Sequence, residues 1–128
     1  MWDKQKAEGV TFADCELAWT SFDKAARIFR FKWNGMLQGN MKEKEFRIHP
    51  TQKPVALYEW ILTNYAKPGD IILDTHVGSA SSLIACHNTN HKYVGFEIDP
   101  EYYRMAKKRL DAEEAQQTIW NFTGDSYV

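Results

Sequence analysis

The chain has 128 residues and a formal net charge of −1, and it is 44% hydrophobic and 14% aromatic. This size and composition predict one folded domain or part of a larger one, and they exclude a chain that is disordered throughout. No apolar run could cross a bilayer and no signal segment opens the chain, so we expect a cytoplasmic protein with no membrane partner. Cys15 and Cys86 have no metal-ligand spacing and indicate a reducing compartment.

The N-terminal third of the sequence predicts short strands and a loop. Trp2-Asp3-Lys4 has no helix cap before it, which we interpret as the first residues of a piece of a longer protein. Arg27–Trp33 alternates basic and apolar residues and then meets Asn34-Gly35, so it predicts a half-exposed strand that ends in a turn. Residues 35–47 are polar and predict a loop.

Positive charge is concentrated between residues 24 and 53. This segment holds eight basic and two acidic residues, a net charge of +6 that leaves −7 for the rest of the chain. Aromatic residues lie between the basic ones, a pattern that fits contact with nucleic-acid phosphates. A solvated strand face is the alternative, and the composition favours neither. The basic residues are Lys24, Arg27, Arg30, Lys32, Lys42, Lys44, Arg47 and Lys53.

The rest of the sequence predicts alternating helices and strands. Two prolines make His49–Pro54 irregular, and Pro68-Gly69 ends the helix that follows. Asp99 caps a later helix that has Pro100 at its first position. We expect a helix from about 55 to 66, a strand at 71–74, a helix at 79–87, a strand at 93–97, a helix from 100 and a last strand at 118–122. This order predicts an α/β fold with a parallel, doubly wound sheet.

The stretch from Asp74 to Glu97 predicts a nucleoside-cofactor site. A strand ends at Asp74 and gives way to Gly78-Ser79, where small residues let a ligand approach the backbone at the start of a helix. About twenty residues further on, Glu97 stands where an acid can hold ribose hydroxyls. Gly78 is alone, so the glycine pattern of NAD enzymes is missing, and no Gly-Lys-Ser/Thr phosphate loop is present. S-adenosylmethionine, which has no phosphates, suits these residues best.

Four blocks of the sequence are similar to one enzyme family. They are His49-Pro-Thr-Gln-Lys-Pro54, Lys67-Pro-Gly-Asp-Ile-Ile-Leu-Asp74, Val77-Gly-Ser79 and Gly95-Phe-Glu-Ile-Asp-Pro-Glu-Tyr102. In this order they resemble the C-terminal part of the β-type amino DNA methyltransferases, which modify N6 of adenine or N4 of cytosine. Segments 2–4 and 12–22 resemble phage-type relatives. The resemblance implies a three-layer, doubly wound and mostly parallel sheet that is incomplete here.

The resemblance also implies roles for single residues. Residues 49–128 would be the cofactor half, with Lys53 on the cofactor carboxylate, Glu97 on the ribose and Ile98 near the adenine. Residues 1–48 would be residual strands and a target-recognition segment that binds double-stranded DNA. The implied cofactor residues are Thr51, Gln52, Lys53, Asp74, Gly78, Ser79, Glu97 and Ile98, and the implied DNA-binding residues are Arg27, Arg30, Lys32 and Trp33. The implied reaction is methylation of adenine, or less favoured cytosine, within restriction-modification.

The chain departs from the family pattern at two places in the turn and in one missing motif. His76 replaces an aromatic residue, and Ala80 replaces a glycine, which lowers cofactor affinity if that position needs a positive φ. The family's catalytic Asp/Ser-Pro-Pro-aromatic motif is absent, because no Pro-Pro occurs in the chain. We therefore expect no catalytic residue and no activity of the chain alone. The alternative is a non-catalytic remnant that folds and forms a homodimer through an exposed sheet edge.

Three polar groupings have a simpler interpretation. His87 and His91 have helical spacing, but without a third ligand they predict a surface pair and no metal site. Asp14 and Glu16 predict solvent-facing or ion-paired side chains. His49 is expected to be a structural anchor for its loop.

Overall fold

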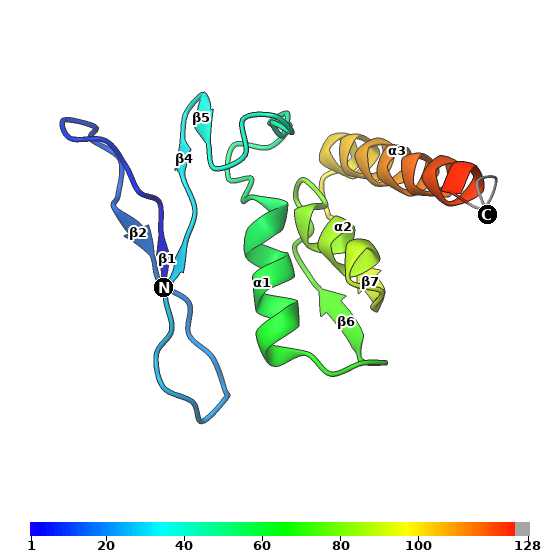
Figure 1. Cartoon of the computed structure of the whole chain (residues 1–128), viewed down its shortest axis with the longest axis horizontal. Helices are drawn as coiled ribbons and strands as arrows, with labels where there is room; N and C mark the ends of the chain where they lie inside the picture. The colour runs from blue at the N-terminus through cyan, green and yellow to red at the C-terminus, as the bar shows by residue number, and fades with distance from the viewer. Residues whose placement is uncertain (125–128) are drawn as a thin grey trace. The chain divides into compact units, whose positions relative to one another are not determined.

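The structure is a computed structural model that describes the backbone of residues 1–124 and the side chains of residues 1–116 (Figure 1). The chain forms two compact units, Met1–Phe46 and Arg47–Val128. The predicted division after residue 48 lies two residues beyond this boundary, and the functions assigned to the two parts stay predictions. No helix among the described residues combines the length and apolar character that a bilayer crossing requires.

The first unit is built from five two-residue strands. In one sheet, β1 (Trp2–Asp3) lies between β2 (Cys15–Glu16), which is antiparallel to it, and β3 (Phe29–Arg30), which is parallel. A separate antiparallel hairpin joins β4 (Trp33–Asn34) to β5 (Leu37–Gln38).

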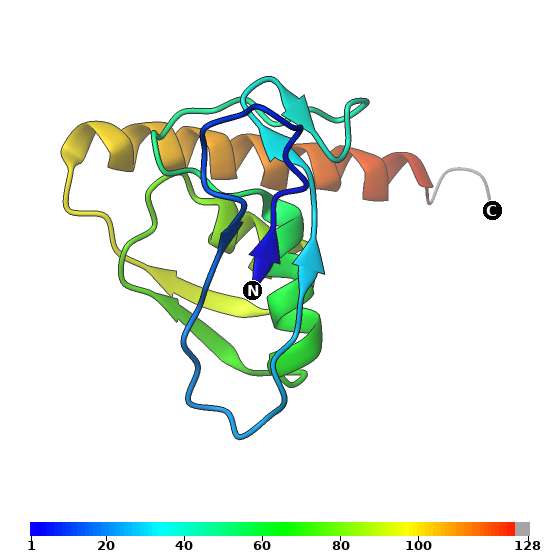
Figure 2. The same ribbon diagram turned by 90° about the vertical axis from the view of Figure 1, so that its left-hand side faces the viewer.

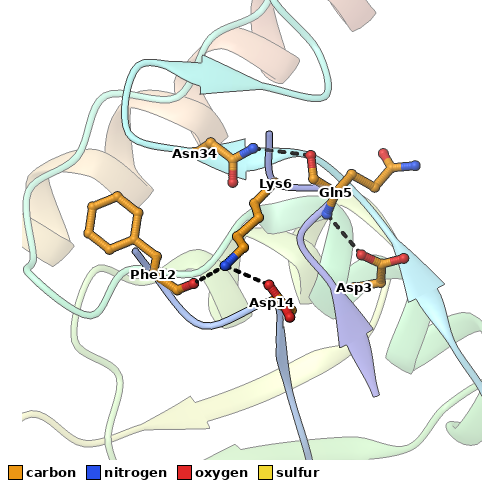
Figure 3. Close-up of polar contacts among 6 residues, drawn as sticks. All are labelled: Asp3, Gln5, Lys6, Phe12, Asp14 and Asn34. Atoms are coloured by element: carbon orange, nitrogen blue, oxygen red, sulfur yellow. Dashed lines mark hydrogen bonds and ion pairs between the residues drawn. The ribbon is translucent and has the colours of Figure 1, made fainter. Parts of the chain in front are cut away.

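Hydrogen bonds from side chains hold the loop between β1 and β2. The Lys6 ammonium donates to the Phe12 carbonyl oxygen at 2.8 Å and lies 2.6 Å from Asp14 Oδ1 (Figure 3). The Asn34 amide donates to the Gln5 carbonyl oxygen at 3.1 Å, which ties β4 to the end of β1. The contact with Lys6 makes Asp14 ion-paired, which is one of the two roles expected for it.

The predicted single strand at 27–33 is wrong, because the structure breaks it into β3 and β4. The Phe29 amide donates to the Met1 carbonyl oxygen, and the Phe31 amide donates to that of Asp3, two residues further on. The Trp33 amide, however, donates to the carbonyl oxygen of Lys4, only one residue after Asp3. The pairing thus slips by one residue where Gln5 adopts a positive φ of 47°. The predicted loop at 35–47 is partly wrong as well, since it contains β5.

From α1 to the start of α3 the second unit has the predicted order of helices and strands. Its elements are α1 (Val55–Tyr65), β6 (Ile71–Asp74), α2 (Ser81–Asn88), β7 (Lys92–Gly95) and α3 (Pro100–Gly124). β6 and β7 pair in parallel with Ile71 opposite Lys92 and Asp74 opposite Gly95, and Figure 2 shows them side by side. This arrangement confirms the α/β class and fits an incomplete methyltransferase-like fold.

The predicted strand at 118–122 is wrong, because α3 continues through it to Gly124. Thr118, Ile119 and Trp120 have a high propensity for strands. However, no proline or glycine stops the helix between Pro100 and Gly124, and each added residue extends an existing helix by one hydrogen bond. Propagation of the helix therefore outweighs the local strand propensity.

The core of the second unit is centred on α2. Ala85 and Cys86 pack with Leu62 of α1, and the half-buried Ile72 and Tyr93 cover this cluster from the strands. Leu83 and Ala80 pack with Ala106 of α3 in a second cluster. Because α2 contributes to both clusters, it fixes the turn that precedes it against α1 and α3.

One face of the β6–β7 pair is exposed and apolar. Ile71 is 66% exposed and Leu73 61%, and Val94 is exposed beside them, whereas Ile72 faces the core. We call Ile71, Leu73 and Val94 the open face. Parallel sheets are covered on both faces in complete α/β domains. The open face thus marks the side on which this sheet is incomplete.

Candidate functional site

The turn between β6 and α2 forms the centre of the candidate site. Gly78 has a φ of +58° and Ala80, which precedes α2, has a φ of +67°. A left-handed backbone is unfavourable for residues with a Cβ, by roughly 1–2 kcal/mol. Ala80 therefore has the positive φ at which its methyl group, in place of the family's glycine, was expected to be unfavourable.

Glu97 lies against this turn although it follows the neighbouring strand. The Phe96 amide donates to Asp74 O at 2.9 Å and the Val77 amide to Phe96 O at 3.0 Å, which joins the two strand ends. Glu97 Oε2 then accepts the Gly78 N–H at 2.8 Å, and Oε1 accepts the Asp99 N–H at 3.0 Å. Both hydrogen bonds lower the pKa of Glu97, and the bond from Asp99 has the larger effect. The half-buried carboxylate is therefore ionised near neutral pH.

Asp74 closes the turn from the end of β6. Its Oδ1 accepts the His76 N–H at 2.9 Å, and its Oδ2 accepts a hydrogen bond from the Ser82 hydroxyl. The carboxylate thus joins the strand end to the first turn of α2.

Burial, followed by the charge of Asp74, raises the pKa of Cys86 to about 11, so this thiol is a core residue and not a nucleophile.

The Ser79 side chain points into the protein. Ser79 is buried, and its hydroxyl lies 3.1 Å from that of Ser81. Arg109 of α3 donates to both the Ser79 carbonyl oxygen and the Ser81 hydroxyl at 2.8 Å. The sequence analysis missed Arg109, since an arginine thirty residues after the turn carries no local signal for this contact.

The loop that contains Thr51 and Gln52 is closed by its own side chains. Gln52 is buried, and its side-chain Oε1 accepts the Ile48 N–H at 2.9 Å. The backbone N–H of Gln52 donates to the His49 carbonyl oxygen at 3.1 Å. Thr51 is exposed, and both its amide and its hydroxyl contact His49 Nδ1. Lys53 is half-buried and precedes the fully buried Pro54 at the start of α1.

Ile98 is the most exposed large apolar residue near the site. Its side chain is 98% exposed and directly follows Glu97 in sequence. An exposed apolar side chain thus follows the ionised carboxylate directly in sequence.

The residues expected to bind DNA fall into two groups. Arg27, Arg30 and Lys32 are exposed, and the Arg30 guanidinium lies 3.5 Å from Asp3. Trp33 is only 7% exposed. At this exposure the Trp33 ring offers little surface to a base in this conformation, and the DNA-binding role implied for Trp33 stays a prediction.

Among the side chains that the structure describes, no three histidines, cysteines, aspartates or glutamates gather into a group that could hold a metal ion. His91 Nδ1 contacts the Thr89 hydroxyl at 2.9 Å, so this histidine has a local partner at the end of α2.

A family model described as DNA methylase, of the N6 and N4 methyltransferase type, matches residues 2–108. The type II methyltransferase M.HpaI of Haemophilus parainfluenzae is 46% identical over 70 residues, which are 55% of this chain and 22% of that protein. The DNA adenine methyltransferase YhdJ of Escherichia coli (strain K12) is 42% identical over 67 residues, which are 52% of this chain and 23% of YhdJ.

A solved structure is also similar. The crystal structure of an M1.HpyAVI–SAM complex is 34% identical with a TM-score of 0.48, over 55% of this chain and 40% of that chain. The chain spans less than a quarter of the length of M.HpaI and of YhdJ. Because the family model covers most of the sequence, the chain belongs to the N6/N4 DNA methylase family.

Proposed function

We propose that this chain is the cofactor-binding part of a DNA methyltransferase and that it binds S-adenosylmethionine beside the Gly78 turn, on the exposed side of Glu97. The observation that carries the proposal is the 2.8 Å hydrogen bond from the Gly78 amide to the Glu97 carboxylate. This contact lies at the carboxyl ends of two parallel strands, where ligands bind in open α/β sheets. The crystallised relative named as a SAM complex supports the same ligand.

The residues of the site fit this cofactor. Glu97 is an ionised, partly exposed acceptor for ribose hydroxyls, and Ile98 offers an apolar surface for the adenine. Lys53 provides a cation for the cofactor carboxylate, with Thr51 beside it on the same loop. Gln52, Asp74 and Ser79 stay proposed cofactor residues, and the contacts described above also hold the loop and the turn in shape.

The bound cofactor would supply an activated methyl group, and a flipped adenine, or less favoured cytosine, would accept it at its exocyclic amino group. The residues that orient such a base are expected on a Pro-Pro motif, which these 128 residues lack. We therefore infer that the chain alone transfers no methyl group to duplex DNA. A radiolabelled-methyl assay tests this point, and any label in DNA above a protein-free blank would contradict it.

DNA contact through the first unit is the second part of the proposal. The exposed Arg27, Arg30 and Lys32 support it, because phosphates are bound mainly by such side chains. In a gel-shift titration at several salt concentrations, Arg30→Ala with Lys32→Ala should weaken binding to duplex DNA and reduce its salt dependence. Binding that is unchanged by this pair of substitutions would remove the proposed interface.

A non-catalytic module is the alternative function, and the open face favours it. Ile71, Leu73 and Val94 present apolar surface that a second copy of the chain could cover. The two functions differ in their ligand. In equilibrium dialysis, the cofactor function predicts retention of S-adenosylmethionine and weaker retention of adenosine, but no retention of NAD. A folded, dimeric sample that retains none of the three would favour the alternative.

A further inference from the structure

We propose that His49 is a positioning residue of the cofactor site, because its ring joins the Thr51–Lys53 loop to the Gly78 turn. The inference rests on the proposed function, since these two segments are the walls assigned to the cofactor. His49 lies in the second unit with both of them and is half-buried. Three sets of contacts carry the argument.

The first set fixes the loop. His49 Nδ1 lies 3.2 Å from the Thr51 amide nitrogen and 3.0 Å from the Thr51 hydroxyl oxygen. A backbone N–H can only donate, so Nδ1 accepts this bond and the ring proton is assigned to Nε2. The Gln52 amide donates to the His49 carbonyl oxygen at 3.1 Å. The loop is therefore wound around His49 by one side-chain acceptor and one main-chain acceptor.

The second set reaches the turn. Carbon atoms of the His49 ring lie 3.7–3.8 Å from the place that a Cβ would take on Gly78, which is ordinary van der Waals distance. The Gly78 amide is the group that donates to Glu97 Oε2. The His49 ring thus packs beside the residue that orients the carboxylate expected to hold the ribose.

The third set supports the ring from α3. The Tyr102 ring has its centroid 4.2 Å from that of His49, at an interplanar angle of 55°. Tyr102 lies in the first turn of α3, whose start is capped by Asp99. The Asp99 amide in turn donates to Glu97 Oε1. A single imidazole therefore contacts the loop and the first turn of α3 and lies beside the Gly78 turn, and both this turn and the cap of α3 donate to Glu97.

Two substitutions separate a positioning residue from a plain loop anchor. His49→Asn places an amide oxygen near the position of Nδ1, so it keeps an acceptor for Thr51 and removes the ring. His49→Phe keeps a ring against Gly78 and Tyr102 and removes the acceptor. A plain anchor needs only the acceptor, whereas a positioning residue needs both.

His91→Asn is the matched control. His91 also places Nδ1 near a threonine hydroxyl two residues away in sequence, at 2.9 Å from Thr89. It follows the C-terminal end of α2, whereas the candidate site is at the N-terminal end. Any effect of replacing a histidine as such should therefore occur in this variant too.

The test uses the full chain labelled with ¹⁵N, first without ligand and then in a calorimetric titration with S-adenosylmethionine. In the absence of ligand, His49→Phe should shift the Thr51 amide signal, and His49→Asn should shift that of Gly78. Each variant should raise the Kd by about tenfold, the size expected when one hydrogen bond or its equivalent packing is lost. His91→Asn should leave the two amide signals and the Kd unchanged.

Different results overturn different claims. Unchanged Thr51 and Gly78 signals in both His49 variants would overturn the inference but not the proposed function. A His49→Asn variant that binds as tightly as the wild type would reduce His49 to a loop anchor. If the His49 variants shift these amide signals but the wild-type chain binds no S-adenosylmethionine, the proposed function is overturned, and the cofactor role of His49 with it.

Discussion

The Gly78 amide donates to Glu97 Oε2 at 2.8 Å across nineteen positions of sequence. This bond joins the turn after β6 to the residue that follows the end of β7, so it depends on the parallel pairing of the two strands. It also leaves the carboxylate partly exposed, with each of its oxygens already accepting a hydrogen bond from a backbone amide. The candidate site is therefore organised before any ligand binds.

The Glu97 bonds predict a dependence of stability on pH. Because the pKa of Glu97 is lowered from its ordinary value of 4.5, the folded state binds its proton less readily than the unfolded state. The resulting stabilisation is fully present above the unfolded-state pKa and is lost as the pH falls through the lower, folded-state value. Glu97→Gln should therefore flatten the dependence of the melting temperature on pH below about pH 4.5. Parallel wild-type and variant curves would contradict this.

The position of Ala80 predicts that a smaller side chain is tolerated there and a larger one is not. Ala80→Gly removes left-handed strain of roughly 1–2 kcal/mol, but it loses a buried methyl worth about 0.8 kcal/mol and adds backbone entropy to the unfolded chain. These effects nearly cancel, so the free energy of unfolding should change by less than about 1 kcal/mol.

Ala80→Val should instead lower that free energy by more than about 2 kcal/mol, because a β-branched residue fits poorly in a left-handed, fully packed position. Urea unfolding of both variants measures the difference. Equal stability of the two variants would show that Ala80 is neither strained nor tightly packed.

Arg109 predicts that the turn depends on α3. Arg109→Ala removes the charged donor from the Ser79 carbonyl oxygen and the Ser81 hydroxyl, and the loss should be about 1.5–3 kcal/mol of unfolding free energy. Lys108→Ala is the matched control, since Lys108 is exposed on the same helix and should change stability by less than about 0.5 kcal/mol. Similar losses in both variants would mean that Arg109 contributes no more to stability than an exposed side chain on the same helix.

The open face predicts an alternation along β6. Leu73→Ser should leave the free energy of unfolding nearly unchanged and reduce self-association, because its side chain is exposed. Ile72→Ser should lower that free energy by about 3 kcal/mol, since Ile72 packs against Leu62 and Cys86. Sedimentation velocity and urea unfolding measure the two effects. A large loss of stability in Leu73→Ser would show that this face is covered.

Much of the second unit could be predicted because its signals are local. Pro68-Gly69 ends α1, Asp99 caps α3, and short apolar runs mark the two strands, so the order of elements from α1 to the start of α3 was confirmed, whereas the strand predicted at 118–122 was wrong. The site was predicted only where a motif marks it. The position of His49 beside Gly78 and the hydrogen bond from Arg109 to Ser79 depend on how α2, α3 and the loop pack, which no local pattern encodes.

The first unit was predicted less well for the same reason. The alternation in Arg27–Trp33 indicates a strand, but the slip in pairing comes from the positive φ of Gln5, far away in sequence. Trp33 alternates with basic residues as a base-stacking side chain would, yet it is buried. Burial depends on tertiary packing, which the pattern of one strand does not determine.

The binding of S-adenosylmethionine to the wild-type chain and to Glu97→Gln, measured by isothermal titration calorimetry, tests the central claim most directly. Glu101→Gln, an exposed acid in the first turn of α3, is the matched control. The site described here predicts saturable binding to the wild type, equal affinity in Glu101→Gln, and a Kd at least about tenfold higher in Glu97→Gln. A folded wild-type chain that releases no heat at millimolar ligand, or a Glu97→Gln variant that binds equally well, would contradict it.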